Sequence, residues 1–417
     1  MAATAGSSSS VIPDASSLRS RNFPSPNFSS SEALLCLHRC TSFNQMKQIH
    51  GRIIRSGLQQ HQNQLIVARL IRLCSSFGKL DYAYLVLERI EDPTSFSWNL
   101  LIRAHTENGR PVKAVLLYNL MIRRGVDADK FTFPFAMKAC LASGFVEKAR
   151  ELYGFAVKRG MWRDVYLNNL LMAVYFKYGA LDDALKVFDK MPRHNKTAVS
   201  WTTAIAGLLR RGRVDHARKL FDEMPRRNVV SFTAMINGYA RSEKPERAFE
   251  LFARMQREDV TPNEYTLVGL AMSCSRLGIL ELGHRVHEYA TGNGFEIGPF
   301  LGTALIDMYS KCGSPDHAKR VFEGMEERSS AATWNAMITS LGIHGNGEEA
   351  LSLFEEMERT TNIEPDAFTL TGVLAACLQT NNVEKGIKYF YHMINRYGIE
   401  PVPEHYTYLS RFQSESR

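Results

Sequence analysis

Several signatures of catalysis and of membrane insertion are missing from this sequence of 417 residues. No apolar run approaches the roughly 18 residues that a membrane-spanning helix needs. The seven cysteines are scattered and include no Cys-x-x-Cys pair, which argues against a disulfide framework and a zinc ribbon. A phosphate-binding Gly-rich loop, a Gly-x-Ser-x-Gly turn and a His-Glu-x-x-His helix are also absent. The sequence therefore predicts no catalytic activity, no metal or other cofactor, and no membrane partner.

The start of the chain has a composition of its own. Residues 1–27 are rich in Ser, Ala and Pro and contain one acidic residue, Asp14. They lack the apolar core, about 7–15 residues long, of a secretory signal. A Ser-rich, acid-poor leader is typical of an organellar transit peptide and favours the chloroplast, with the mitochondrion as second choice. The alternative is a disordered tail that carries no targeting signal.

The remaining composition is that of a folded, basic chain. It is 45% hydrophobic and 23% charged, with a formal net charge of +8. A basic surplus favours a polyanionic partner, because each neutralised phosphate releases counterions.

A small residue followed four positions later by a large one recurs ten times. Successive small residues are separated by 31, 35, 35, 33, 31, 35, 35, 32 and 36 positions, which identifies an internal repeat. The pairs are Ala83/Leu87, Ala114/Tyr118, Ala149/Tyr153, Ala184/Phe188, Ala217/Phe221, Ala248/Phe252, Gly283/His287, Ala318/Phe322, Ala350/Phe354 and Gly386/Phe390.

Each repeat has the same internal order of two helices around a turn. An apolar helix-periodic run comes first, a glycine follows, and a second amphipathic helix carries the small/large pair. The turn glycines are Gly78, Gly109, Gly144, Gly179, Gly212, Gly278 and Gly313. One hairpin cannot bury its apolar face alone, so neighbouring hairpins must stack, and the small residue lets helices approach closely. The predicted fold is all-α: a right-handed superhelical α-solenoid of stacked helix-turn-helix hairpins.

A protein-interaction scaffold of tetratricopeptide repeats is the alternative, because its period is also close to 34 residues. Tetratricopeptide units keep a fixed length, whereas the lengths here alternate. Two polar positions in each unit, described below, also argue against a scaffold.

The motifs within the repeats resemble those of the plant pentatricopeptide repeat (PPR) family, in particular its PLS subclass with alternating P, L and S units. Residues 304–313, ALIDMYSKCG, look like an S unit almost word for word. The motifs VSWT at 199–202 and VSFT at 230–233 look like P- or S-unit starts, and KQIH at 47–50 is typical of a first L unit. The resemblance covers about 28 to 406.

The predicted domain organisation has three parts. Residues 1–27 are the leader, 28–402 hold eleven units, and 403–417 are the truncated, disordered start of a further unit. The unit ranges are 28–63, 64–94, 95–129, 130–164, 165–197, 198–228, 229–263, 264–298, 299–330, 331–366 and 367–402.

The resemblance implies single-stranded RNA recognition by two residues per unit, the fifth and the last. Amide and hydroxyl groups at the fifth position both donate and accept hydrogen bonds, so they suit the edge of an unpaired base. The candidate RNA-binding pairs are Asn99/Asp129, Asn169/Asn195 (or Thr197), Thr202/Asn228, Thr233/Asn263, Thr303/Ser330 and Asn335/Asp366. In this family Asn with Asp implies uracil and Thr with Asn implies adenine, so the implied target is U-n-Y-A-A-n-A-U from 5′ to 3′. A helix N-cap is the alternative role for any one of these side chains.

The second residue of most units is apolar and is a candidate for stacking on bases. Phe96, Val199 and Val230 are the candidates singled out. Packing between units is the alternative role.

The family often continues into extension domains and a zinc deaminase, whose chemistry needs His-x-Glu with Cys-x-x-Cys. His105-Thr106-Glu107 matches the first half alone. The chain thus resembles an organellar factor truncated before its E/DYW-type extension. The resemblance implies a site-recognition factor for C-to-U RNA editing, with a deaminase-bearing or other editing factor acting in trans. RNA stabilisation, splicing or processing by occupancy is the alternative, and DNA is not expected as a partner.

Overall fold

The structure is a computed structural model that describes residues 28–58 and 64–415. Across these ranges it contains 23 α-helices and two short 3₁₀-helices, with no β-strand. No helix in the described ranges is long and apolar enough to cross a bilayer. The predicted all-α class is confirmed, whereas the predicted leader at 1–27 lies outside the described residues.

The described chain divides into two compact units. The first, up to Trp162, holds α1 (Ser30–His38), α2 (Phe43–Arg55), α3 (Gln64–Ser76), α4 (Leu80–Glu88), α5 (Ser95–Glu107), α6 (Pro111–Arg123), α7 (Thr132–Ser143) and α8 (Val146–Lys158). The second, from Arg163, holds α9 (Val165–Tyr178), α10 (Leu181–Lys190), α11 (Ala198–Arg210), α12 (Val214–Glu223), α13 (Val229–Ala240), α14 (Arg247–Arg257), α15 (Glu264–Leu277), α16 (Leu280–Gly292), α17 (Pro299–Lys311), α18 (Pro315–Gly324), α19 (Ala331–Ile343), α20 (Gly347–Thr360), α21 (Ala367–Gln379), α22 (Val383–Asn395) and α23 (Pro403–Glu415). The 3₁₀-helices are η2 (Met161–Arg163) and η3 (Arg193–Asn195).

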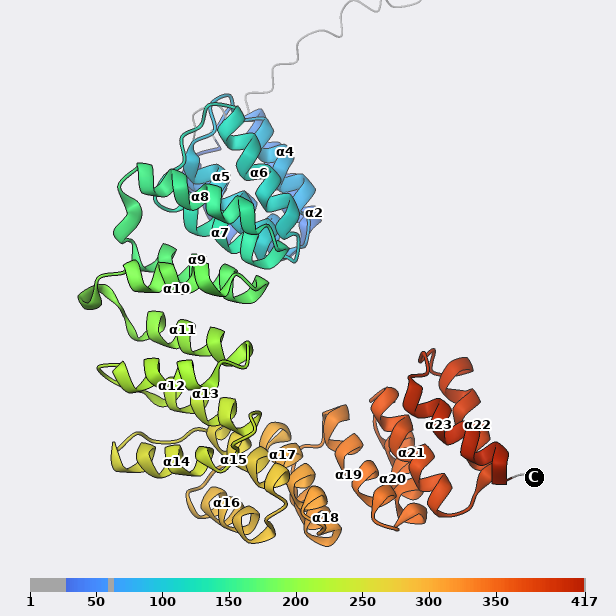
Figure 1. The fold of residues 1–417 in the computed structure, drawn as a ribbon. Helices are drawn as coiled ribbons and strands as arrows, with labels where there is room; N and C mark the ends of the chain where they lie inside the picture. Colours follow the sequence, from blue (N-terminus) through green and yellow to red (C-terminus); the bar gives the residue numbers. More distant parts are fainter. Residues whose placement is uncertain (1–27, 59–63, 416–417) are drawn as a thin grey trace, which may run out of the picture. The chain divides into compact units, whose positions relative to one another are not determined.

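Each of the eleven predicted repeat ranges contains two consecutive α-helices, and the unit boundaries themselves stay a prediction. The first helix of a repeat contacts its own second helix and the first helix of the next repeat, as α13 contacts α14 and α15. In the second compact unit these hairpins follow one another side by side (Figure 1). Consecutive first helices therefore form one continuous layer within each compact unit.

The turn between the two helices depends on a left-handed backbone. All seven predicted turn glycines have positive φ, as at Gly179, whose φ is 95°. An L side chain is strained in this region, so glycine ends the first helix at little cost. The predicted turn positions are confirmed.

The small/large pairs contribute to the core, and three large members, Tyr153, Phe252 and His287, are only partly buried. The small member is buried in all ten pairs. Phe221 of α12 packs edge-on against Phe232 of α13, with ring centroids 5.0 Å apart, and Phe188 packs in the same way against Trp201. The second helix of one repeat is thus joined to the first helix of the next by a perpendicular aromatic pair.

The end of the chain differs from the expectation of disorder. Residues Pro403–Glu415 form α23, which contacts α21 and α22. The ring of Phe412 is fully buried and lies so close to Gly386 that a Cβ there would be 2.5 Å from it. The buried His405 also bonds Thr371 at 2.8 Å and the carbonyl of Ala367 at 2.9 Å. The prediction of disorder is wrong for 403–415, because the apolar end of the last hairpin gives this helix a surface to bury against.

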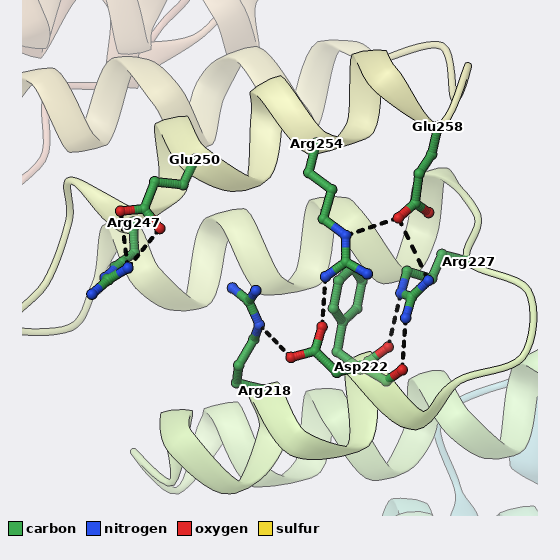
Figure 2. A network of polar contacts seen from close by, with 8 residues as sticks. Arg218, Asp222, Arg227, Arg247, Glu250, Arg254 and Glu258 are labelled. Atoms are coloured by element: carbon green, nitrogen blue, oxygen red, sulfur yellow. Dashed lines mark hydrogen bonds and ion pairs between the residues drawn. The ribbon is translucent and has the colours of Figure 1, made fainter.

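An ion-pair network joins the second helices α12 and α14 (Figure 2). Arg254 Nη1 lies 2.5 Å from Asp222 Oδ1, and its Nε lies 2.8 Å from Glu258 Oε1. Arg227 donates to the backbone carbonyl of Asp222 at 2.6 Å and reaches Glu258 at 3.5 Å. Burial raises the pKa of Asp222, but hydrogen bonds from Arg218 and Arg254 outweigh it and leave the pKa below its ordinary value. The network is present at neutral pH, and its contribution is lost as the pH falls through that lowered pKa.

We expect Arg254→Met to lower the free energy of unfolding by about 1 kcal/mol, since the ion pairs with Asp222 and Glu258 are partly buried and share the Arg254 guanidinium. Urea unfolding at low and high salt measures the effect, which should shrink with salt. Arg247→Met is the control: Arg247 pairs with Glu250 within one helix, and both side chains are more than half exposed (Figure 2). The control should cause no measurable change, and equal losses in both variants would contradict the bridging role.

Candidate nucleic-acid interface

The last residue of several predicted units caps the first helix of the next unit. Asp164, Asn228, Asn263 and Asp366 each accept the backbone N–H three residues on, at 2.8, 3.0, 3.0 and 2.9 Å. Asp129 accepts two backbone N–H groups at the start of α7, at 2.8 and 2.9 Å. These side chains therefore act as helix N-caps, which is the alternative role given for them above. Capping fixes each of them at the start of the first helix of the next unit.

Three predicted pairs are in direct contact. Asn99 Nδ2 donates to Asp129 Oδ1 at 3.0 Å and to Oδ2 at 3.2 Å. Asn335 Nδ2 donates to Asp366 Oδ1 at 3.0 Å. The hydroxyl of Thr233 donates to Asn263 Oδ1 at 3.3 Å. In these units the cap residue accepts hydrogen bonds both from the start of the next helix and from the fifth residue of its own unit. The two predicted positions therefore form one polar cluster.

Asp129 is held as a carboxylate. Burial raises its pKa, but hydrogen bonds from the Ser95 hydroxyl, from backbone N–H groups of Thr132 and Phe131, and from Asn99 outweigh burial and lower the pKa. The Ser95 hydroxyl lies 2.7 Å from Asp129 Oδ2. An ionised carboxylate only accepts hydrogen bonds, so this site favours a partner group that donates.

The other three predicted pairs are not brought together. The structure gives no hydrogen bond between Thr202 and Asn228; Thr202 donates to the carbonyl of Ala198 instead. Thr303 contacts Thr333 at 2.8 Å rather than Ser330.

The pair in 165–197 differs because of extra residues before the next unit. Asn195 lies in η3, and Thr197 caps α11, with its hydroxyl accepting from Ser200 N at 3.4 Å. Thr197, rather than Asn195, therefore occupies the place that Asp366 and Asn263 occupy in their units. Asn169 is buried, and its Oδ1 has no hydrogen-bond partner among the described residues.

A groove of about 1170 Å³ runs along the first helices of the second compact unit. It is lined by residues of α15, α17, α19 and α21 and of the segments that precede α19 and α21. Four candidate binding residues face it, namely Thr303, Ser330, Asn335 and Asp366. The groove therefore presents candidate binding residues of two successive units on one surface.

The second residues of most units are exposed, although the rings of Tyr265 and Phe300 also contact each other across a unit boundary, with centroids 6.1 Å apart. Phe300 and Phe368, which line the groove, are 67% and 75% exposed. The three predicted stacking candidates are also exposed, Phe96 at 40%, Val199 at 59% and Val230 at 56%. Apolar side chains thus alternate with the polar clusters along the first helices.

One set of polar residues was not predicted. The third residue of the following unit carries a hydroxyl in seven cases: Ser97, Thr132, Ser200, Ser231, Thr266, Thr333 and Thr369. All seven are buried, and three of them bond the fifth residue of the preceding unit. The recurrence of Ser or Thr three residues after a cap was a signal that could have identified them.

Family models match most of the described repeats. The model described as PPR repeat family matches 93–142, 227–275 and 329–379, and the model described as PPR repeat matches 169–195, 199–229 and 303–330.

Relatives and a solved structure agree with these matches. A chloroplastic pentatricopeptide repeat-containing protein of Arabidopsis thaliana is 51% identical over 381 residues, which cover 91% of this chain and 83% of the relative. A second, chloroplastic/mitochondrial protein of that species is 36% identical over 88% of this chain, which spans about half (53%) of that relative's length. The crystal structure of a pentatricopeptide repeat protein from maize shares the fold, with a TM-score of 0.63 at 16% identity over 92% of this chain and 62% of that chain.

Proposed function

The chain belongs to the plant pentatricopeptide repeat family, and from this premise we propose that it binds single-stranded organellar RNA along the first helices of its repeats. The observation that carries the proposal is the groove that holds Asn335, Asp366, Thr303 and Ser330. Hydrogen-bonding side chains alternate there with the exposed rings of Phe300 and Phe368. Unpaired bases are recognised by this combination of edge hydrogen bonds and stacking.

We propose that the fifth and last residues of a unit select the base. Asp129 and Asp366 present carboxylates that accept, and uracil offers an N–H donor on its pairing edge, so the Asn/Asp units select uracil. The Thr/Asn units at 198–228 and 229–263 select adenine. The L units, with Pro134 and Val268 at the fifth position, space the bases without reading them, as the PLS subclass implies. The proposed target remains U-n-Y-A-A-n-A-U.

The biological role we propose is site recognition for C-to-U editing in the chloroplast, with the deaminase supplied in trans. Chloroplast location is supported by the composition of residues 1–27 and by the names of two relatives. Occupancy of an RNA segment, protecting it or directing its splicing or processing, is the second role within the same binding function.

An RNA gel shift tests the binding. We expect the predicted oligonucleotide to bind at least about tenfold more tightly than its scrambled version, because each mismatched base weakens binding by about 1–3 kcal/mol. Equal binding of both RNAs at several salt concentrations would instead fit a tetratricopeptide-like scaffold with an unspecific basic surface. Sequencing organellar RNA from a plant that lacks the protein, with editing, splicing and transcript ends scored together, separates the two roles.

A further inference from the structure

A buried hydroxyl lies behind the fifth residue in three units between 229 and 402. It belongs to the third residue of the following unit. The contacts are Thr266 Oγ1 to Thr233 Oγ1 at 2.7 Å, Thr333 Oγ1 to Thr303 Oγ1 at 2.8 Å, and Thr369 Oγ1 to Asn335 Oδ1 at 2.6 Å. All three threonines are 0% exposed. They cannot touch a base, so any effect on recognition must pass through the fifth residue.

The geometry is clearest at Asn335. Its Nδ2 donates to Asp366 Oδ1 at 3.0 Å, while its Oδ1 accepts from the Thr369 hydroxyl at 2.6 Å. The carboxylate only accepts, so it selects the amide orientation in which Nδ2 faces it, and the hydroxyl then donates to the amide oxygen and adds a second bond to that orientation. The groups left toward the groove are then the second N–H of Nδ2 and one lone pair of Oδ1. Without the hydroxyl, only Asp366 would hold this orientation.

We propose that Thr266, Thr333 and Thr369, which contact the fifth residue of the preceding unit, are specificity-determining positioning residues. Each hydroxyl helps to fix which hydrogen-bonding groups that fifth residue presents to a base, and so sharpens the selection made by the pair in contact with the RNA. The inference rests on the proposed RNA function and deepens it, because these three units then use two residues that face the base and one buried residue behind them.

The first compact unit contains the same three side chains in a different arrangement. Asn99, Asp129 and Thr132 correspond to Asn335, Asp366 and Thr369. Thr132 lies 3.1 Å from Asp129 Oδ1, and Thr369 likewise lies 3.2 Å from Asp366 Oδ1, measured from the hydroxyl oxygen. The sites differ at the amide, because Asn99 Oδ1 is buried without a hydrogen-bond partner in the described part of the chain. Both threonines cap their helix, since Thr132 and Thr369 each accept the N–H of the cap residue at 3.0 Å. The capping contact is therefore present at both sites, whereas the contact between the threonine hydroxyl and the fifth residue is present at Thr369 and not at Thr132.

The experiment compares Thr369→Val, Thr369→Ser and Thr132→Val in the full chain. Dissociation constants are measured for RNAs that carry each of the four bases opposite 331–366 or opposite 95–129. We expect Thr369→Val to reduce the preference at its own unit about fivefold, the effect of one ordinary hydrogen bond. Thr369→Ser keeps the hydroxyl and should restore the preference. Thr132→Val should leave the preference at its own unit unchanged.

The outcomes separate this inference from the function it rests on. If the unmodified protein prefers no base at either unit, the proposed base reading is wrong. If that protein has a preference and Thr369→Val retains it, the positioning role is wrong. Equal loss in Thr369→Val and Thr132→Val would assign the effect to helix capping and would also overturn the inference. Circular dichroism checks folding, and should Thr369→Val not fold, Thr266→Val provides the same comparison at 229–263.

Discussion

Gly207→Ala is expected to destabilise the protein by about 3 kcal/mol, near the upper end for overpacking a well-packed core. Gly207 lies in the middle of α11, where a Cβ would be 2.2 Å from Cγ of Phe176 in α9. The Phe176 ring is buried and has little room to move. The added methyl group must therefore separate the two first helices and weaken the interface between their repeats. In a stacked repeat array, stability depends on such nearest-neighbour interfaces.

Urea unfolding followed by circular dichroism measures the change, and hydrogen exchange in α9 and α11 locates it. Gly154→Ala is the matched control, because Gly154 is also inside a helix and a Cβ there meets no atom within 4 Å. The control should be stabilised by about 0.5–1 kcal/mol, the usual gain when alanine replaces a helical glycine. Stabilisation of both variants would show that α9 and α11 do not approach as closely as described.

The repeat itself could be predicted from the sequence because its main determinants are local. A positive-φ turn needs glycine at a fixed place, and a close helix contact needs a small residue four positions before a large one. Gly179 and the pair Ala217/Phe221 carry this information without reference to distant residues. Local rules of this kind recur in most hairpins, so the imperfect copies reinforce one another.

Helix α23 could not be predicted in the same way. Its stability depends on the ring of Phe412 packing against Gly386. These residues are 26 positions apart in the sequence, and they come together only when the hairpin is folded. The buried contact of His405 with Thr371 likewise depends on tertiary structure.

The candidate site was predictable in its positions and less so in its contacts. Counting from the start of a unit identified Asn99/Asp129, Thr233/Asn263 and Asn335/Asp366, which do meet. Counting failed at Asn195, because a 3₁₀ turn takes up the extra residues and places Thr197 at the cap. The contact of Thr369 with Asn335 crosses a unit boundary, so positions counted within one unit do not reveal it. Sequence spacing thus locates a side chain on the first helix, whereas hydrogen-bond partners depend on how two repeats stack.

Exchanging both Asn/Asp pairs for Thr/Asn should change the preferred RNA at two positions. The variant carries Asn99→Thr, Asp129→Asn, Asn335→Thr and Asp366→Asn. A carboxylate only accepts hydrogen bonds, whereas the amide that replaces it also donates and so accommodates adenine's acceptor nitrogen. We expect preference to move from U to A at both positions, by about tenfold at each and about a hundredfold together, because the two sites are far apart in the chain and should act additively.

The fold should tolerate these changes, since Asn and Asp are nearly equivalent as helix N-caps. Asp164→Asn is the control for capping alone. Asp164 caps α9 through the N–H of Leu167 at 2.8 Å, but the fifth residue of its unit is Pro134, whose side chain offers no hydrogen-bonding group. Dissociation constants for RNAs with U or A at the two positions should change in the fourfold variant and stay unchanged in the control. A folded fourfold variant that still prefers U at both positions would refute base selection by these pairs, and binding would then depend on stacking and charge along the groove.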